Sequence, residues 1–181
     1  MVDQWLVFLQ HTEKMKIIDN CIEKEDQDNI EKLLLRNEKF PWFFLEDITY
    51  IGKQKRPALK HYFIHDTAGV VSEFCTKTVI APLMALNSDN MNVLRMVSFL
   101  QFPNNIKKVD TPHTDRSQPH TVLIYYVIDS DGDTVFYKNK KIIKRVTPKK
   151  GRAVIFDGSI SHSAFQPNKH LRCIINFNIE K

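Results

Sequence analysis

Residues 121–156 read TVLIYYVIDSDGDTVFYKNKKIIKRVTPKKGRAVIF. Short runs of β-branched and aromatic residues alternate here with the polar segments DSDGD, KNK and TPKKG, which contain residues that favour turns. Apolar runs of this length, bounded by turn signals, are typical of strands joined by tight connections. The stretch therefore predicts an antiparallel β region.

The same texture continues on both sides of this stretch. VLRMVSFLQF precedes it, and SHSAF and RCIINFNI follow it, again with turn signals between the runs. Seven short strands with tight connections indicate an antiparallel sandwich or barrel of the jelly-roll or cupin type. We therefore expect residues 93–181 to form a jelly-roll core.

The first half of the chain has a different pattern. Apolar residues in the later half of 16–36 recur with helical spacing, and residues 72–87 suit a helix bent at Pro82. Residues 60–67 indicate a strand. We therefore expect residues 1–92 to be mainly helical and to support the β core, which gives an α+β fold.

Composition limits the class of protein. A chain of 181 residues is long enough to bury a core, and residues 1–181 are expected to form one domain. Hydrophobic content of 43% and charged content of 26% are typical of globular proteins. The chain contains no run of 18 apolar residues, so no membrane span is expected. The N-terminus lacks the features of a signal peptide.

The cysteines bear on the cellular location of the protein, and its net charge bears on the kind of partner it could bind. The three cysteines are widely separated and include no CxxC pair, which favours a reducing compartment and hence the cytoplasm. The net charge of +5 is spread along the chain. The lysine-rich stretches KNKKIIKR and PKK are either solvated hairpin turns or a surface for an acidic partner.

A candidate metal site stands out within the β region. His113 and Asp115 are two residues apart, so on an extended segment their side chains point the same way. His162 follows a predicted strand and turn, and it supplies a third ligand if the two segments are neighbours. Two histidines and one carboxylate, with open positions opposite, favour Fe(II). Catalytic zinc sites more often use three histidines, or two histidines and a glutamate.

Ten residues after His162 lies Arg172, at the start of the apolar run RCIINF. If this run is a strand, Arg172 either points into the barrel or faces water at the strand mouth. A buried guanidinium in an apolar strand requires a partner, and it grips a carboxylate with two hydrogen bonds.

These motifs together resemble those of the Fe(II)/2-oxoglutarate-dependent oxygenases, specifically the prolyl-4-hydroxylase-like branch. In order, the chain shows FPNN, HTD, IYY, GDTVF, AVIF, SHS and an arginine ten residues after the histidine of SHS. The resemblance runs from about Met96 to Phe177, close to half of the chain. It implies a double-stranded β-helix core with supporting N-terminal helices.

The resemblance also implies roles for individual residues. The family's HxD motif and distal histidine correspond to His113, Asp115 and His162, which would bind iron. The family's basic residue corresponds to Arg172, which would bind the far carboxylate of 2-oxoglutarate. Relatives often place a tyrosine of the strand after HxD on the same carboxylate; of Tyr125 and Tyr126, which face opposite sides, we favour Tyr126.

The implied activity is that of an oxidoreductase: a dioxygenase that hydroxylates a C–H bond and decarboxylates 2-oxoglutarate to succinate. Fe(II) is the implied metal, 2-oxoglutarate and dioxygen are cosubstrates, and ascorbate is an additional candidate cofactor. A prolyl residue of a peptide, a free amino acid or another small molecule is the expected substrate. Alkylated nucleic acid is less favoured, because its branch of the family usually has an arginine where this chain has Asn178.

Some features depart from the family or leave alternatives open. Phe102 and Asp110 occupy places where relatives often carry a tyrosine that contacts the cosubstrate, and Asp131 or Asp133 replaces a glycine of the family's GGETVF. Arg116 either pairs with Asp115 or meets an acidic substrate. A cupin-like binding or sensing module without chemistry is the alternative to an enzyme. Lid loops that select the substrate are expected at residues 50–60 and 104–120, and the sequence does not determine the oligomeric state.

Overall fold

The computed structural model describes residues 15–48, 56–86, 92–104 and 109–181. The parts of the two predicted lid loops at 50–55 and 105–108, and the N-terminal segment 1–14, lie outside the described residues. The elements are β1 Met15–Ile18, α2 Lys24–Leu35, β2 Phe43–Leu45, β3 Ala58–His65, β4 Gly69–Val70, α3 Lys77–Met84, β5 Val93–Gln101, β6 His120–Tyr126, β7 Thr134–Lys138, β8 Lys141–Val146, β9 Ala153–Asp157, β10 Ser161–Ala164 and β11 Arg172–Glu180.

Two antiparallel sheets make up most of this structure. The larger sheet has the strand order β1-β9-β6-β11-β5-β3-β2, with β4 paired to β3, and the smaller sheet has the order β10-β7-β8. The seven strands expected after residue 93 are all present as β5 to β11. Turn chemistry explains the hairpin between β7 and β8, where Asn139 and Lys140 adopt positive φ angles of 51° and 62°.

The first half of the chain is less helical than its sequence suggested. The helical spacing within 16–36 corresponds to α2, and the helix expected at 72–87 is α3, with Pro82 inside it. However, the described residues before 92 also contain β1 to β4, all in the larger sheet. Short apolar runs such as Met15–Ile18 do not distinguish helix from strand by periodicity, and pairing with β9 decides the outcome.

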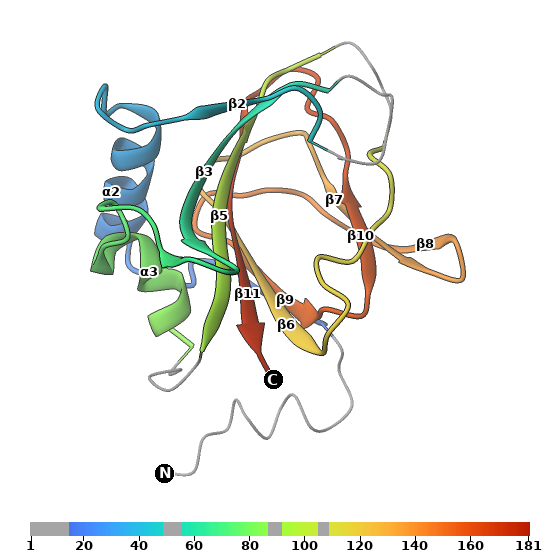
Figure 1. Ribbon diagram of the computed structural model, residues 1–181. Coiled ribbons are helices and arrows are strands. Elements are labelled where there is room, and N and C mark those ends of the chain that lie inside the picture. The colour runs from blue at the N-terminus through green and yellow to red at the C-terminus, as the bar shows by residue number, and fades with distance from the viewer. Residues whose placement is uncertain (1–14, 49–55, 87–91, 105–108) are drawn as a thin grey trace.

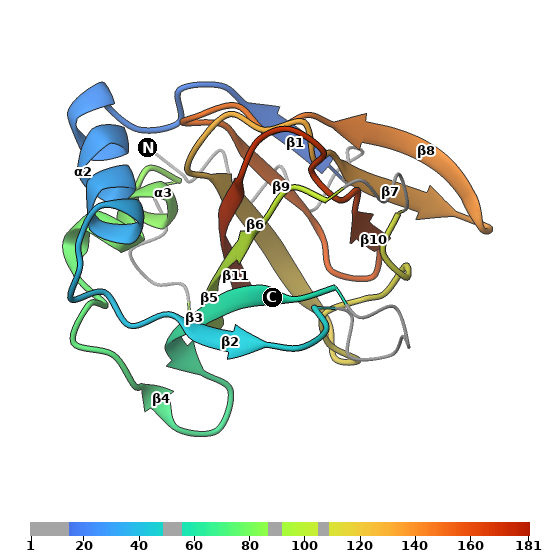
Figure 2. The same cartoon turned by 90° about the horizontal axis from the view of Figure 1, so that it is seen from above.

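The larger sheet separates two hydrophobic cores. On one face, α2 and α3 pack against the sheet through residues that include Ile30, Leu34 and Val79. On the other face, the larger sheet faces the smaller one across a second cluster that includes Val122, Phe136 and Phe156. Figures 1 and 2 show the helices on one side of the larger sheet and the β10-β7-β8 sheet on the other.

Strand β11 shows how this arrangement positions polar side chains. Cys173, Ile175 and Phe177 belong to the core on the helix side, whereas Arg172, Ile174 and Asn176 line a cavity between the sheets. Because successive side chains of a strand point to opposite faces, every second residue of this run points toward the cavity.

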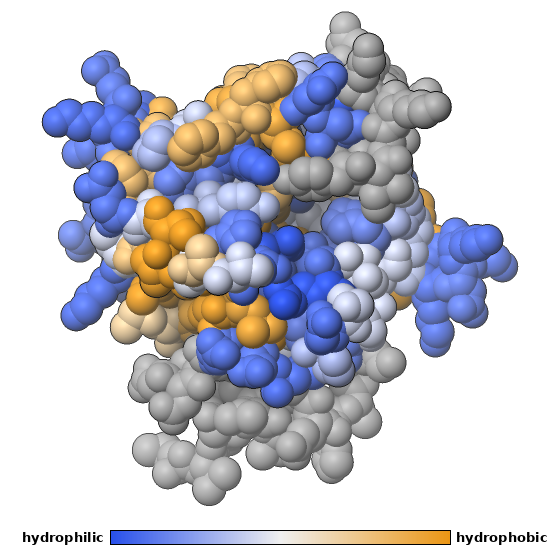
Figure 3. Space-filling view, in the orientation of Figure 1, coloured by the Kyte–Doolittle hydropathy of each residue, from blue (hydrophilic) through white to orange (hydrophobic). Residues whose placement is uncertain are grey.

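Two further observations concern the β7–β8 hairpin and the length and polarity of the helices. The β7–β8 hairpin projects from the molecule with hydrophilic side chains gathered on it (Figure 3), as expected for a solvated turn. Among the described residues, no helix has the length and apolar character that crossing a membrane requires.

Candidate active site

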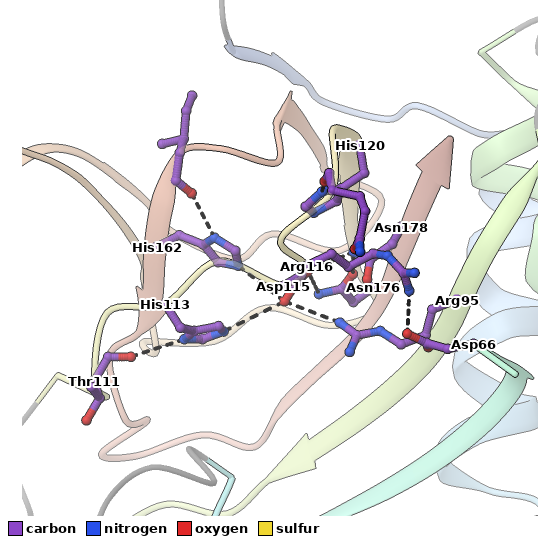
Figure 4. A network of polar contacts seen from close by, with 12 residues as sticks. Asp66, Arg95, Thr111, His113, Asp115, Arg116, His120, His162, Asn176 and Asn178 are labelled. Atoms are coloured by element: carbon purple, nitrogen blue, oxygen red, sulfur yellow. Dashed lines mark hydrogen bonds and ion pairs between the residues drawn. The ribbon is translucent and has the colours of Figure 1, made fainter. Parts of the chain in front are cut away.

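Three side chains that are distant in the sequence meet between the two sheets. One ligand atom from each of His113, Asp115 and His162 lies within 4.8 Å of the others. The Nε2 atoms of His113 and His162 lie 3.8 and 3.9 Å from Asp115 Oδ1, and both imidazoles point toward that carboxylate (Figure 4). The structure thus brings together the two histidines and the carboxylate that the sequence singled out.

Backbone pairing holds the two histidines beside each other. His113 N donates to His162 O, and His162 N donates to His113 O, both at 2.9 Å. This pair is an antiparallel bridge between the segment that precedes β6 and strand β10. Because the bridge is made by main-chain atoms, it holds the backbones of the two histidines side by side whatever contacts their side chains make.

The histidine rings are also oriented. Nδ1 of His113 lies 3.1 Å from the carbonyl oxygen of Thr111, and Nδ1 of His162 lies 3.1 Å from that of Ile160. A carbonyl oxygen only accepts, so each Nδ1 carries the proton when this bond forms. Each Nε2 then directs a lone pair toward Asp115, as a metal ligand requires.

Asp115 is held by partners on its other oxygen. Oδ2 accepts hydrogen bonds from the side-chain amides of Asn176 and Asn178, at 3.0 and 2.8 Å. Oδ1 faces the two histidines and forms an ion pair with Arg95 at 3.3 Å. The two amide donors on Oδ2 leave Oδ1 as the oxygen that a metal ion would bind.

The protonation states suit metal binding. Burial lowers the pKa of His162 to about 4, which outweighs the attraction of Asp115. Burial by itself would raise the pKa of Asp115, but His162, Arg95 and the two amide donors hold this pKa well below its usual range. At neutral pH the site therefore presents a neutral imidazole and an ionised carboxylate, the forms that bind metal ions.

The donor set fits a first-row transition metal. Two ligands bonded to one ion at about 2.1 Å lie at most about 4.2 Å apart, so the spacings of 3.8 and 3.9 Å accommodate one ion. Two imidazoles and one carboxylate on one side of an ion leave positions open on the other, the arrangement of mononuclear Fe(II) sites that bind a cosubstrate and dioxygen.

A cavity of about 240 Å³ extends from this site between the sheets. His113 and Asp115 line one end and Arg172 and Thr134 line the other, with Phe99 among the apolar residues between them. The volume is below that of pockets for drug-sized ligands and suits a small acid.

Arg172 is a buried cation at the closed end of this cavity. Its side chain donates to Gly132 O at 2.9 Å, Gln101 Oε1 at 2.7 Å and Thr134 Oγ1 at 2.9 Å. All three acceptors are neutral, and burial lowers the pKa of the guanidinium. Because an unpaired buried charge is costly, an anion in the cavity would stabilise this end. The alternative of an arginine in water at the strand mouth does not hold, since Arg172 is 3% exposed.

Neighbouring residues shape the closed end. A Cβ atom at position 132 would lie 2.9 Å from Arg172 Cδ and 2.8 Å from the carbonyl oxygen of Phe165, so only glycine fits there. Tyr126 faces the space between the sheets and donates to Thr134 Oγ1 at 2.7 Å. Tyr125 faces the helices. Tyr126 therefore reaches the closed end through Thr134, which also contacts Arg172.

Asp110 takes part in a buried ion pair at the cavity wall. It pairs with Arg56, and Gln166 Nε2 donates to both of its carboxylate oxygens at 2.9 Å. Burial raises the pKa of Asp110, against the effects of Gln166 and Arg56. Phe102 is instead half-exposed. Neither residue supplies the hydroxyl that relatives often carry at these two places.

The remaining polar candidates have partners elsewhere. Arg116 pairs with Asp66 rather than with Asp115. His61 is buried, with Nδ1 beside Pro41 O and Nε2 beside Ser72 Oγ, which is a structural role. His120 is also buried and does not line the cavity; its Nδ1 lies 2.8 Å from a main-chain carbonyl oxygen.

Several side chains of the site were not singled out from the sequence, or were noted without a role in it: Arg95, Gln101, Thr134, Asn176 and Asn178. The sequence does contain a pattern that could have indicated some of these residues. Asn176 and Asn178 lie four and six residues after Arg172, so they share its face of the strand RCIINFNIE. Gln101 pairs directly with Arg172 across β5 and β11, and that register is a property of the sheet alone.

Many solved structures have a similar fold. An oxidoreductase of the 2OG-Fe(II) oxygenase family from Burkholderia pseudomallei is 10% identical with a TM-score of 0.74, covering 98% of this chain and 89% of that one. A prolyl-4-hydroxylase from Pseudomonas putida is 14% identical with a TM-score of 0.67, covering 100% and 99%. The chain has the double-stranded β-helix fold of 2-oxoglutarate oxygenases.

A third structure with this oxygenase fold carries a peptide. It is a prolyl hydroxylase from Trichoplax adhaerens in complex with a fragment of the hypoxia inducible factor oxygen degradation domain, 14% identical with a TM-score of 0.67, covering 98% of this chain and 88% of that one. No protein-family model matches the chain, and no curated protein matches it by sequence. At these identities the likeness establishes the oxygenase fold, and the site's own chemistry has to carry the function.

Proposed function

We propose that the protein is an Fe(II)- and 2-oxoglutarate-dependent dioxygenase that hydroxylates a C–H bond and converts 2-oxoglutarate to succinate. One observation carries this proposal. The ligand atoms of His113, Asp115 and His162 converge, and His113 and Asp115 line the same cavity as Arg172, a buried cation that has no carboxylate partner among the described residues. A metal site at one end and a carboxylate site at the other match an acid that is bound at both ends.

Each residue then has a role. His113, Asp115 and His162 hold the iron, and Asn176 and Asn178 keep Asp115 bound through one oxygen. The iron, together with the keto acid and dioxygen, would supply the oxidising chemistry.

The closed end receives the cosubstrate. Arg172 grips the far carboxylate of 2-oxoglutarate with two charged hydrogen bonds, and Thr134 lies beside it. Tyr126 fixes Thr134 through its hydroxyl. Apolar residues such as Phe99 and Ile174 line the cavity between the two ends and keep the site dry.

The substrate class follows from two sources of support. The Trichoplax enzyme of this fold is described with a peptide bound, which supports a prolyl residue of a peptide as substrate; a free amino acid or another small molecule is the alternative. Asn178 occupies the position where the nucleic-acid branch usually has an arginine, and it donates to Asp115, which disfavours alkylated nucleic acid.

The finer features of the fold belong to the same proposal. Residues 1–181 would form one oxygenase domain with a jelly-roll core like that of cupins, supported by the helices α2 and α3. The free cysteines 21, 75 and 173 support a cytoplasmic location. Ascorbate would act as a reductant that keeps the iron ferrous.

Succinate release tests the function directly. The purified protein is loaded with Fe(II) without oxygen, mixed with 2-oxoglutarate, exposed to air and assayed for succinate, with and without proline-rich peptides, free amino acids and alkylated single-stranded DNA. We expect succinate from wild type and none from His162→Ala. Retention of iron and binding of 2-oxoglutarate without succinate in any mixture would instead identify a binding or sensing module.

A further inference from the structure

A second arginine lies at the metal end of the cavity. Arg95 is on β5, where it pairs with Asn178 of β11, and its side chain lines the cavity beside His113 and Asp115. Figure 4 shows its guanidinium approaching Asp115 from the side opposite the histidines. Arg95 therefore belongs to the metal end of the cavity, beside Asp115.

The guanidinium of Arg95 is only partly used. Its Nη2 lies 3.3 Å from Asp115 Oδ1, and its buried Nε has no hydrogen-bond partner among the described residues. Nε and Nη2 form one edge of the guanidinium, and such an edge binds the two oxygens of a carboxylate with two parallel hydrogen bonds. On this edge, Nε has no hydrogen-bond partner among the described residues, and Nη2 contacts Asp115 Oδ1, the oxygen that a metal ion would also bind.

The other arginines near the cavity differ from Arg95. Arg56 has its own carboxylate, Asp110. Arg116 also has a buried Nε without a hydrogen-bond partner among the described residues, but it has its own carboxylate in Asp66 and does not line the cavity. Arg172 has three neutral hydrogen-bond acceptors. Arg95 and a bound metal dication would both be balanced only by the single negative charge of Asp115. The metal end would then carry an excess of positive charge. An anion would restore the balance.

We propose that Arg95 is a second carboxylate-binding residue, placed in the cavity wall at the metal end, beside Asp115. This inference rests on the proposed function. The carboxylate has two possible sources: the keto-acid end of 2-oxoglutarate, or an acidic group on the substrate. A purely positioning role toward Asp115 is the alternative, and it makes a different prediction for metal affinity.

The experiment uses the full chain saturated with Mn(II), which binds such ligands without turnover in air. Calorimetry measures the affinity for 2-oxoglutarate in wild type, Arg95→Gln, Arg95→Lys and Arg116→Gln. Arg116 is the matched control, because both arginine side chains are 19% exposed and both are near Asp115, but Arg116 is already paired. In a second arm, acetate is titrated into the complex with Mn(II) and 2-oxoglutarate.

Two results would support the proposal and name the source. If 2-oxoglutarate binds roughly 10-fold more weakly to Arg95→Gln, with a smaller loss for Arg95→Lys and none for Arg116→Gln, the cosubstrate supplies the carboxylate. If 2-oxoglutarate binds equally to all four proteins but acetate binds wild type and not Arg95→Gln, the substrate supplies it. Removing the cation would leave Mn(II) affinity equal or higher in both cases.

Two results would overturn it. The first is unchanged affinity of Arg95→Gln for both probes. The second is weaker binding of Mn(II) alone, which indicates that Arg95 only positions Asp115. Failure of wild type to bind 2-oxoglutarate would count against the proposed function instead. Circular dichroism melting of each variant checks folding, and the Arg95→Lys arm keeps the test decisive if Arg95→Gln is unstable.

Discussion

The two ends of the cavity present opposite kinds of polar atom. At the metal end, lone pairs of His113, Asp115 and His162 converge on one point, and neighbouring donors hold their other atoms. At the closed end, Arg172 brings a buried positive charge with only neutral acceptors around it. One end therefore suits a metal cation and the other suits an anion.

Because the two ends differ in this way, substitutions at one end should affect a different binding step from substitutions at the other. Changes at the metal end should weaken metal binding, and changes at the closed end should weaken binding of the acid at saturating metal. The shared scaffold of β11 connects them, since Arg172 begins the strand and Asn176 and Asn178 lie further along it. Four experiments test this separation, in decreasing order of expected effect.

The largest effect is expected from His162→Ala. Loss of one of three ligands should reduce metal affinity by more than about 1,000-fold, while the backbone bridge to His113 preserves the local fold. Calorimetric titration with Mn(II) measures the first effect and thermal melting the second. His170→Ala removes an exposed histidine and should bind metal like wild type. Normal metal binding by His162→Ala would mean that the metal site is wrongly assigned.

Arg172→Gln should have the next largest effect, and at the opposite end. Loss of two charged hydrogen bonds costs about 3 kcal/mol, so 2-oxoglutarate should bind roughly 100-fold more weakly at saturating metal. Metal affinity should stay unchanged. Arg36→Gln, at the exposed C-terminal cap of α2, is the control. An unchanged affinity for the acid would show that another residue receives the far carboxylate.

Asn178→Ala sharpens the description of the metal end. It removes the shorter of the two amide hydrogen bonds on Asp115 Oδ2, at 2.8 Å. Substitution of residues that hold a metal ligand typically weakens metal binding by about 10- to 100-fold. The affinity for 2-oxoglutarate at saturating metal should change little. If metal affinity is unaltered, Asn176 alone suffices to orient the carboxylate.

The smallest effect is expected from a matched pair, Tyr126→Phe and Tyr125→Phe. The hydroxyl of Tyr126 donates to Thr134 beside Arg172, so its loss should weaken binding of 2-oxoglutarate by about 5-fold. The buried hydroxyl of Tyr125 has no partner in the described part of the chain, and its removal should leave that affinity unchanged and the melting temperature equal or higher. Equal effects of the two changes on 2-oxoglutarate binding would contradict the assigned faces.

The comparison also shows which residues local sequence patterns could indicate. His113 and Asp115 are two residues apart, and Arg172 lies ten residues after His162; the resemblance to the oxygenase family then indicates all four residues together. Period-2 alternation on β11 extends the set to Asn176 and Asn178 once Arg172 is known to face inward. In contrast, Arg95, Gln101 and Arg56 come from strands or loops whose pairing the sequence does not state.

The first half of the chain illustrates the limit of periodicity. Helix α2 follows from its apolar spacing, whereas β1 is four residues long and takes its strand conformation from pairing with β9, far away in the sequence. Segments this short carry too few residues for a period to be read, so partner strands decide their structure.

By itself, the sequence determined the β-rich second half, the strand positions and the residue types for a metal and a carboxylate, because turn residues and side-chain alternation are local properties. The pairing of strands and segments in three dimensions decided that His113 faces His162 across a bridge, that Arg172 has no carboxylate partner in the described ranges, and that Arg95 stands at the metal end. The physical reason is that these features depend on which strands pair and in what register, and such pairing is set by the packing of the whole core.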